Sequence, residues 1–159
     1  MKMKIISPKD KYKDDNTNHD VINYIMRDDK CCSGCLITRN VKRNTIAEDM
    51  AEYDRKFHKR ENCTKIRHTM ISFEDRDDMT LERAADIADK VCDYYSEYPV
   101  VAAVHEDTDN LHIHMVMATT NIHTGKKYTG RKKDYYDFQR ELKKVARKYG
   151  MEYRTLKSS

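Results

Sequence analysis

The sequence predicts an α+β fold, in which an antiparallel sheet carries helices packed on one face as a two-layer α/β sandwich. Three observations lead to this class. A few short segments have the apolar pattern of strands, two of these segments are close enough to form a hairpin, and amphipathic segments lie between the others. The chain has 159 residues, the size of one ordinary domain, so we expect a single domain over residues 1–159.

The first half of the chain is expected to hold two strands and two helices. A strand at 2–6 is stopped by Ser7-Pro8, and a helix at 18–26 places three apolar residues on one face. A second helix begins at Thr45, because its apolar residues recur at spacings of four, three and four. Between these helices, residues 28–44 are charged and contain a cysteine cluster, so we expect an irregular segment there. Residues 66–73 alternate in the manner of a strand.

The second half begins with the clearest helix of the sequence. Thr80 is its expected cap, an apolar stripe from Leu81 to Tyr95 is its buried face, and Pro99 ends it. Strands at 100–104 and 111–118 follow, joined by a turn-like segment at 107–110, and we expect them to pair as a hairpin. A last helix at 134–149 stops at Gly150.

Composition excludes several classes of protein. The mean hydropathy is −0.96, and the longest apolar run covers only residues 100–104, far short of the ~20 residues of a membrane span. No apolar export segment begins the chain, and the five cysteines, an odd number, are expected to be reduced thiols. We therefore expect a cytoplasmic protein without a membrane partner.

The positive charge is concentrated in one segment. The whole chain has 31 Lys and Arg against 27 Asp and Glu, yet residues 126–148 alone hold ten basic and three acidic residues. A basic segment on a nearly neutral protein indicates a polyanionic partner, although many such runs are solvated helix faces. Tyr128, Tyr135 and Tyr136 lie in or beside this segment and offer rings that either stack on unpaired bases or pack against the core.

Three histidines form the pattern with the clearest chemistry. His112 and His114 are two residues apart on an expected strand, so their side chains point to the same face. If the preceding strand pairs with this one, His105 lies across from them, and the three imidazoles suit a divalent transition metal with open positions. Asp107, in the connecting turn, would orient a ligand imidazole or simply form the turn. His68 is expected to pack in or beside the sheet.

The same residues resemble a known family. The stretch from His105 to Met117, which contains His112-Ile113-His114, resembles the third motif of the relaxases, or mobilisation nucleases, in the VirD/MobA-like branch of the HUH endonuclease superfamily. Residues 21–30 resemble the first motif, residues 68–73 the middle strand, and Gly-Lys-Lys-Tyr at 125–128 is also typical. The resemblance spans nearly the whole chain and implies an HUH-endonuclease-like fold. Residues 1–159 would then be a single relaxase catalytic domain, without the C-terminal accessory regions of longer relatives.

The resemblance implies a reaction and its residues. Tyr24 would be the nucleophile that nicks single-stranded DNA at an origin of transfer and forms a 5′-phosphotyrosine, with His105, His112 and His114 as ligands of Mg²⁺ or Mn²⁺. A three-histidine site also binds Zn²⁺ or Ni²⁺ tightly. Asp107 is a candidate base that would assist Tyr24. Accessory mobilisation proteins are further candidate partners, in the transfer of a plasmid or an integrative element. The residues expected to contact DNA are Arg27, Lys30, Ser72, Lys126, Lys127, Arg131, Lys132 and Lys133.

Two other interpretations stay open at this stage. A rolling-circle replication initiator or a transposase of the same superfamily would use the same chemistry, although those relatives usually place the tyrosine after the histidines. A non-catalytic DNA-binding domain with a structural metal would need the histidines and the basic segment but no nucleophile.

Overall fold

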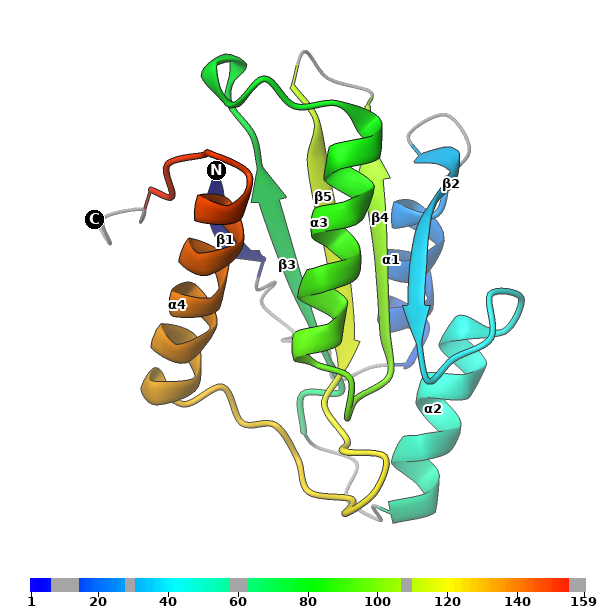
Figure 1. The fold of residues 1–159 in the computed structure, drawn as a ribbon. Coiled ribbons are helices and arrows are strands. Elements are labelled where there is room, and N and C mark those ends of the chain that lie inside the picture. Colours follow the sequence, from blue (N-terminus) through cyan, green and yellow to red (C-terminus); the bar gives the residue numbers. More distant parts are fainter. Residues whose placement is uncertain (7–14, 28–30, 58–62, 107–109, 155–159) are drawn as a thin grey trace.

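The computed structural model describes residues 1–6, 15–27, 31–57, 63–106 and 110–154 of the chain. Five strands form one antiparallel sheet in the order β1-β3-β5-β4-β2 (Figure 1). The strands are β1 (Lys2–Ile6), β2 (Cys31–Arg39), β3 (Ile66–Ser72), β4 (Val100–His105) and β5 (His112–Ala118). The fold class expected from the sequence is therefore confirmed, and β4 and β5 form the expected hairpin.

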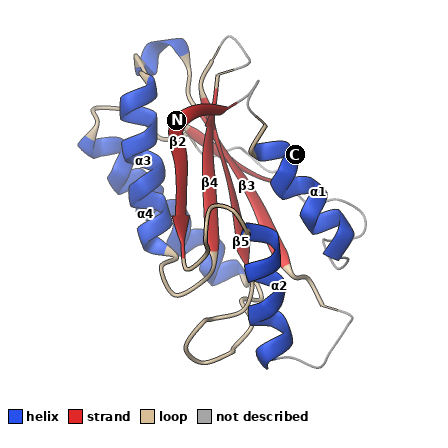
Figure 2. Ribbon diagram, turned by 90° about the vertical axis from the view of Figure 1, so that its right-hand side faces the viewer, coloured by secondary structure: helices blue, strands red, loops and turns tan. Residues whose placement is uncertain are grey.

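Helices cover both faces of this sheet. They are α1 (Asp15–Ile25), α2 (Ile46–Phe57), α3 (Leu81–Tyr94) and α4 (Lys132–Lys148). Figure 2 shows α3 and α4 on one side of the sheet and α1 and α2 on the other. The larger core lies under α3 and α4, where Ile113 and Met115 of β5 are buried. A smaller core, with Val116 of β5, lies under α1 and α2. The sequence led us to expect helices on one face only, whereas α1 and α2 form a second helical layer on the opposite face.

Strand β2 corrects the expectation of an irregular segment at 28–44. Its residues from Leu36 to Arg39 pair regularly with β4, and the register shifts between Cys31 and Leu36. Its apolar pattern lasts only a few residues beside the cysteines and Gly34, too short to reveal an edge strand by periodicity. Cys35 is disulfide-bonded, against the expectation of reduced thiols throughout, while Cys92 is a buried free thiol.

The ends of the two longest helices follow the local rules of the sequence. The Thr80 hydroxyl accepts a hydrogen bond from the backbone N–H of Arg83, so it caps α3 as expected. Gly150 follows α4 with φ at +69°, a left-handed conformation that glycine adopts without steric cost. Among the described residues, no helix is both long enough and apolar enough to cross a bilayer.

Candidate active site

The β4–β5 hairpin brings His105, His112 and His114 together at one end of the sheet. His105 pairs directly with His112, and Ala103 pairs with His114, so all three side chains lie on the face covered by α1. Their ring centroids are 4.4 to 5.2 Å apart, and one nitrogen of each ring lies within 4.8 Å of the others. Three nitrogens at this spacing can ligate one divalent ion and leave coordination positions open.

A hydrogen bond from His105 joins the histidine cluster to α1. The ring Nε2 of His105 lies 2.8 Å from the carbonyl oxygen of Ile25, in the last turn of the helix. A carbonyl can only accept, so Nε2–H donates, and the lone pair of His105 is on Nδ1. The bond also satisfies one of the carbonyls that a helix end leaves without an intrahelical donor. The end of α1, including Tyr24, is thereby fixed over the histidines.

His68 is a fourth histidine at the site. It lies on β3 and faces the same side of the sheet, and its Nε2 is 2.7 Å from Nδ1 of His114. Burial lowers the pKa of His68 to about 4, and the nearby His105 adds to this shift, so the ring is neutral at pH 7. If Nε2 of His114 held a metal, its Nδ1 would carry the proton and donate to His68, an arrangement typical of ligands oriented by an outer partner.

Tyr24 stands beside the cluster. Its ring centroid is 6.2 Å from that of His105 and 6.1 Å from that of His114, edge-on to both. The residue is 43 % exposed, so its hydroxyl is within reach of a large substrate such as DNA. The structure therefore brings together the tyrosine and the three histidines that the sequence analysis singled out.

A groove of about 360 Å³ extends from His112 across neighbouring strands of the sheet. His112 lines one end, Met70 and Ser72 lie in the middle, and Lys2 of β1 lies at the far edge. Register places Ser72 between His112 on one neighbouring strand and Lys2 on the other. The position of Ser72 next to the cluster agrees with the resemblance to the middle motif.

The basic residues expected to contact DNA lie in two places. Arg27 is exposed just beyond α1, on the tyrosine side of the cluster. The residues from 126 to 133 follow the opposite end of β5 from His112, about 20 Å away along the strand. There Lys126, Arg131, Lys132 and Lys133 are exposed, whereas Lys127 forms an ion pair with Asp54 and is only 18 % exposed. Lys30 and Asp107 lie outside the described residues.

Sequence reasoning missed the roles of His68 and Lys2. Both lie at alternate positions that share a face with the histidines, but only the strand order β1-β3-β5 brings them beside the site. The signal for His68 was its even spacing from Ser72, which the resemblance had already placed in the middle motif.

Comparisons with known proteins agree with this geometry. The sequence matches the family described as Relaxase: MobA/VirD2-like, nuclease domain, over residues 24–151. Protein TraI of Escherichia coli is 34 % identical over 88 residues, which are 53 % of this chain and 12 % of that much longer protein.

A solved structure described as "Molecular Basis of Vancomycin Resistance Transfer in Staphylococcus aureus" shares the fold. Its TM-score is 0.54 at 15 % identity, over 81 % of this chain and 76 % of that one. The family match covers most of the chain and includes Tyr24 and all three clustered histidines. The chain therefore belongs to the relaxase family with a MobA/VirD2-like nuclease domain.

Proposed function

We propose that this chain is a metal-dependent relaxase that nicks single-stranded DNA at an origin of transfer through Tyr24. One observation carries the proposal: the Tyr24 ring lies 6.2 and 6.1 Å from His105 and His114, two members of a cluster fit to bind a metal. A phenol next to such a cluster is the arrangement needed for covalent attack on a phosphodiester.

The donor set fits a divalent ion. His105, His112 and His114 would hold it; three imidazole nitrogens bind Zn²⁺ or Ni²⁺ more tightly than Mn²⁺, and Mg²⁺ more weakly, and Mn²⁺ or Mg²⁺ is proposed as the working ion. Held by neutral ligands, the ion would keep its full charge to polarise the scissile phosphate. His68 supports this site by holding the ring of His114 in one orientation.

The reaction proposed for Tyr24 is a transesterification. The Oη atom of Tyr24 forms a bond to phosphorus, and the bond from phosphorus to the 3′ oxygen breaks. The phenol loses one proton and the leaving 3′ oxygen gains one, giving a 5′-phosphotyrosine and a free 3′-hydroxyl. The number of ester bonds is unchanged, so the step can be reversed to rejoin strands. Asp107 is proposed as the base that takes the phenolic proton.

The surroundings of Tyr24 offer a path for the DNA strand. The groove past Ser72 starts at His112 and ends at Lys2, a cation at the right place for a phosphate. Arg27 would contact a phosphate on the other side of Tyr24, and Lys30, outside the described residues, is proposed as a further phosphate contact. The exposed basic residues that follow β5 would extend the DNA interface to the far end of the sheet; Lys126, Arg131, Lys132 and Lys133 form this group.

The biological setting is proposed from the family. We place the protein in the cytoplasm, acting on a plasmid or integrative element together with accessory mobilisation proteins. The relative in Escherichia coli is far longer than the part that matches, so this assignment concerns the nicking domain.

The test compares Tyr24→Phe with Tyr94→Phe, a second exposed tyrosine remote from the histidines. Each protein is incubated with Mn²⁺ and a labelled pool of single-stranded DNA containing candidate origin sequences, then run on a denaturing gel. We expect a labelled band of protein-plus-DNA mass for wild type and Tyr94→Phe, and no such band for Tyr24→Phe. An adduct with Tyr24→Phe would exclude Tyr24 as nucleophile. DNA binding without any adduct in wild type would favour a non-catalytic binding domain.

A further inference from the structure

One cavity in the described part of the molecule has no role in the reaction above. It measures about 560 Å³ and lies between the first turns of α4 and the strands β1, β3 and β5. Met115 and Met117 form its floor, whereas His114 points to the other face of the sheet. The cavity is thus behind the sheet as seen from Tyr24, and it has the size of a site for a small planar ligand.

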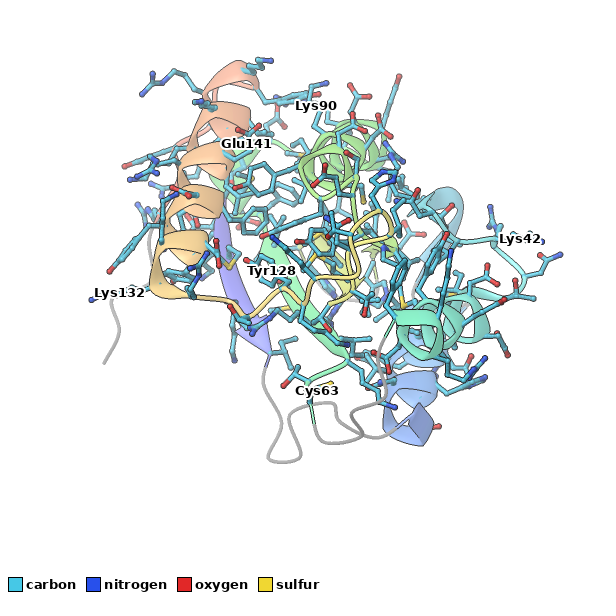
Figure 3. All side chains as sticks on the ribbon, turned by 90° about the horizontal axis from the view of Figure 1, so that it is seen from below. Lys42, Cys63, Lys90, Tyr128, Lys132 and Glu141 are labelled. Atoms are coloured by element: carbon cyan, nitrogen blue, oxygen red, sulfur yellow. The ribbon has the colours of Figure 1, made fainter. Side chains whose placement is uncertain are left out.

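Aromatic rings make up much of its wall. Figure 3 shows Tyr128 on the segment that leads from the sheet to Lys132, where α4 begins. Tyr135, Tyr136 and Phe138 come from the first turns of α4, and Tyr95 from the end of α3. Tyr136 is 49 % exposed at the mouth, so its ring is open to a ligand. Such rings stack on any nucleobase, because every base has a π face.

The charged residues in the wall are Arg67 and Lys132, and no described lining residue is acidic. The guanidinium of Arg67 donates to the carbonyl of Thr129 at 2.8 Å and lies 5.3 Å from the centre of the Tyr128 ring. Its Nε is buried with no hydrogen-bond partner among the described residues. A guanidinium in the cavity wall is suited to contact a phosphate group.

Gly130 allows the loop backbone to approach Arg67 closely. A Cβ at residue 130 would lie 2.4 Å from the Arg67 guanidinium, and the φ of +65° also favours glycine. The glycine therefore allows the loop to close over Arg67 and hold it against Tyr128.

Polar groups at the back of the cavity would face the edge of a base. Gln139 and Thr69 are both buried there. The hydroxyl of Tyr153 donates to Oε1 of Gln139 at 3.1 Å, which orients the amide and leaves its NH₂ group as a donor.

We propose that this cavity binds one unpaired base of the DNA strand, stacked on the tyrosines, with an adjoining phosphate held by Arg67 and Lys132. The inference rests on the proposed function, since the strand is the same one that Tyr24 attacks.

Strand β1 forms the edge of the sheet, with Lys2 and Lys4 on the histidine face and Ile5 lining the cavity on the other. The DNA would pass around this edge from one face to the other. The site also explains why basic residues gather far from the histidines.

The test measures binding of fluorescently labelled (dT)20 by anisotropy, using Tyr24→Phe as the parent so that the DNA is not cleaved. Tyr136→Ala removes a stacking ring, and Tyr136→Phe, the matched control, keeps it. Lys132→Gln removes a charge at the cavity, and Lys144→Gln removes one farther along the same helix. We expect Tyr136→Ala to bind about tenfold more weakly than the parent and Tyr136→Phe to bind equally. Lys132→Gln should lower the log–log salt slope by about one, and Lys144→Gln should leave it unchanged.

A second measurement locates the base directly. The oligonucleotide carries 5-bromodeoxyuridine, the complex is irradiated, and crosslinked peptides are identified by mass spectrometry. Crosslinks to residues 128–139 support the site. Equal binding by all four variants, or crosslinks confined to the histidine face, would overturn this inference and leave the nicking function standing. If the parent does not bind DNA at all, both proposals fail.

Discussion

Nε2 of His68 lies 2.7 Å from Nδ1 of His114, on the sheet face that also carries His105 and His112. This contact joins β3 to the site, whereas the three proposed ligands come from β4 and β5 alone. His68 is buried and neutral, so it can accept a hydrogen bond from His114 without adding charge. We infer that His68 positions a proposed metal ligand and does not itself bind the substrate.

We predict that His68→Ala weakens Mn²⁺ binding about 10- to 100-fold, because the ring of His114 loses the partner that fixes its tautomer and orientation. His68→Gln should recover part of the affinity, since its amide oxygen can accept from Nδ1. Isothermal titration calorimetry measures the affinity, and thermal melts in the absence of metal test the fold. His123→Ala, an exposed histidine elsewhere, is the control. Unchanged affinity in folded His68→Ala would contradict the positioning role.

Replacing a proposed metal ligand should abolish tight metal binding, whereas replacing His68 should only weaken it. In His112→Ala, we expect loss of tight metal binding and of the covalent DNA adduct, while (dT)20 binding in the absence of metal stays within about twofold of wild type. Chelation of the wild type with EDTA should have the same effect and be reversed by added Mn²⁺. Because imidazole ligands follow the Irving–Williams order, Ni²⁺ and Zn²⁺ should bind more tightly than Mn²⁺. Adduct formation by metal-free wild type would exclude the metal's part in the reaction.

The sequence predicted most of the fold and the centre of the site because both depend on local patterns. His105, His112 and His114 sit on two strands joined by a short turn, so alternation and a hairpin were enough to expect them together. His68 is 44 positions before His112, and its place depends on which strand pairs with β5. No local pattern carries that information. Strand β2 was missed for a related reason, since most of its ordering comes from pairing with β4.

The basic segment shows a further limit, because two adjacent lysines with the same expected role differ in the structure. Lys126 is exposed, whereas the ammonium of Lys127 lies 2.5 Å from a carboxylate oxygen of Asp54 and 3.2 Å from the hydroxyl of Thr119. Asp54 is on α2 and Thr119 follows β5, so this contact ties the loop to both. Spacing along the chain did not distinguish a structural lysine from an exposed one.

We predict that Lys127→Met destabilises the fold by about 1 to 3 kcal/mol, because it leaves the half-buried carboxylate of Asp54 without its closest cation. Lys126→Met should change stability by less than about 0.5 kcal/mol, as is usual for exposed positions. Urea denaturation measures both values. If Lys126 contacts a phosphate, Lys126→Met also lowers the salt slope of DNA binding by about one. Equal stability of the two variants would exclude a structural role for Lys127.

The N-terminal ammonium of Met1 forms a buried ion pair with Asp77, at 2.8 Å between nitrogen and Oδ2. The same Oδ2 accepts from the backbone N–H of Glu74, also at 2.8 Å. Burial acts to raise the pKa of the Asp77 carboxyl, but the two hydrogen bonds and the charge of the ammonium outweigh it, and the pKa is lowered from 3.8. The contact holds the start of β1 against the short 3-10 turn at Asp75–Asp77.

A carboxyl whose pKa is lowered by folding stabilises the fold when it is ionised, so its contribution is present above about pH 4 and is lost as pH falls through the folded-state pKa. We therefore predict that Asp77→Asn lowers the free energy of unfolding by about 2 kcal/mol at pH 7 and makes it less dependent on pH below 4. Urea denaturation at pH 7, 4 and 3 measures both effects. Asp75→Asn, an exposed residue of the same turn, should keep the wild-type stability and acid dependence. If Asp77→Asn lost stability in acid as steeply as wild type, another carboxyl would have to be the source of that dependence.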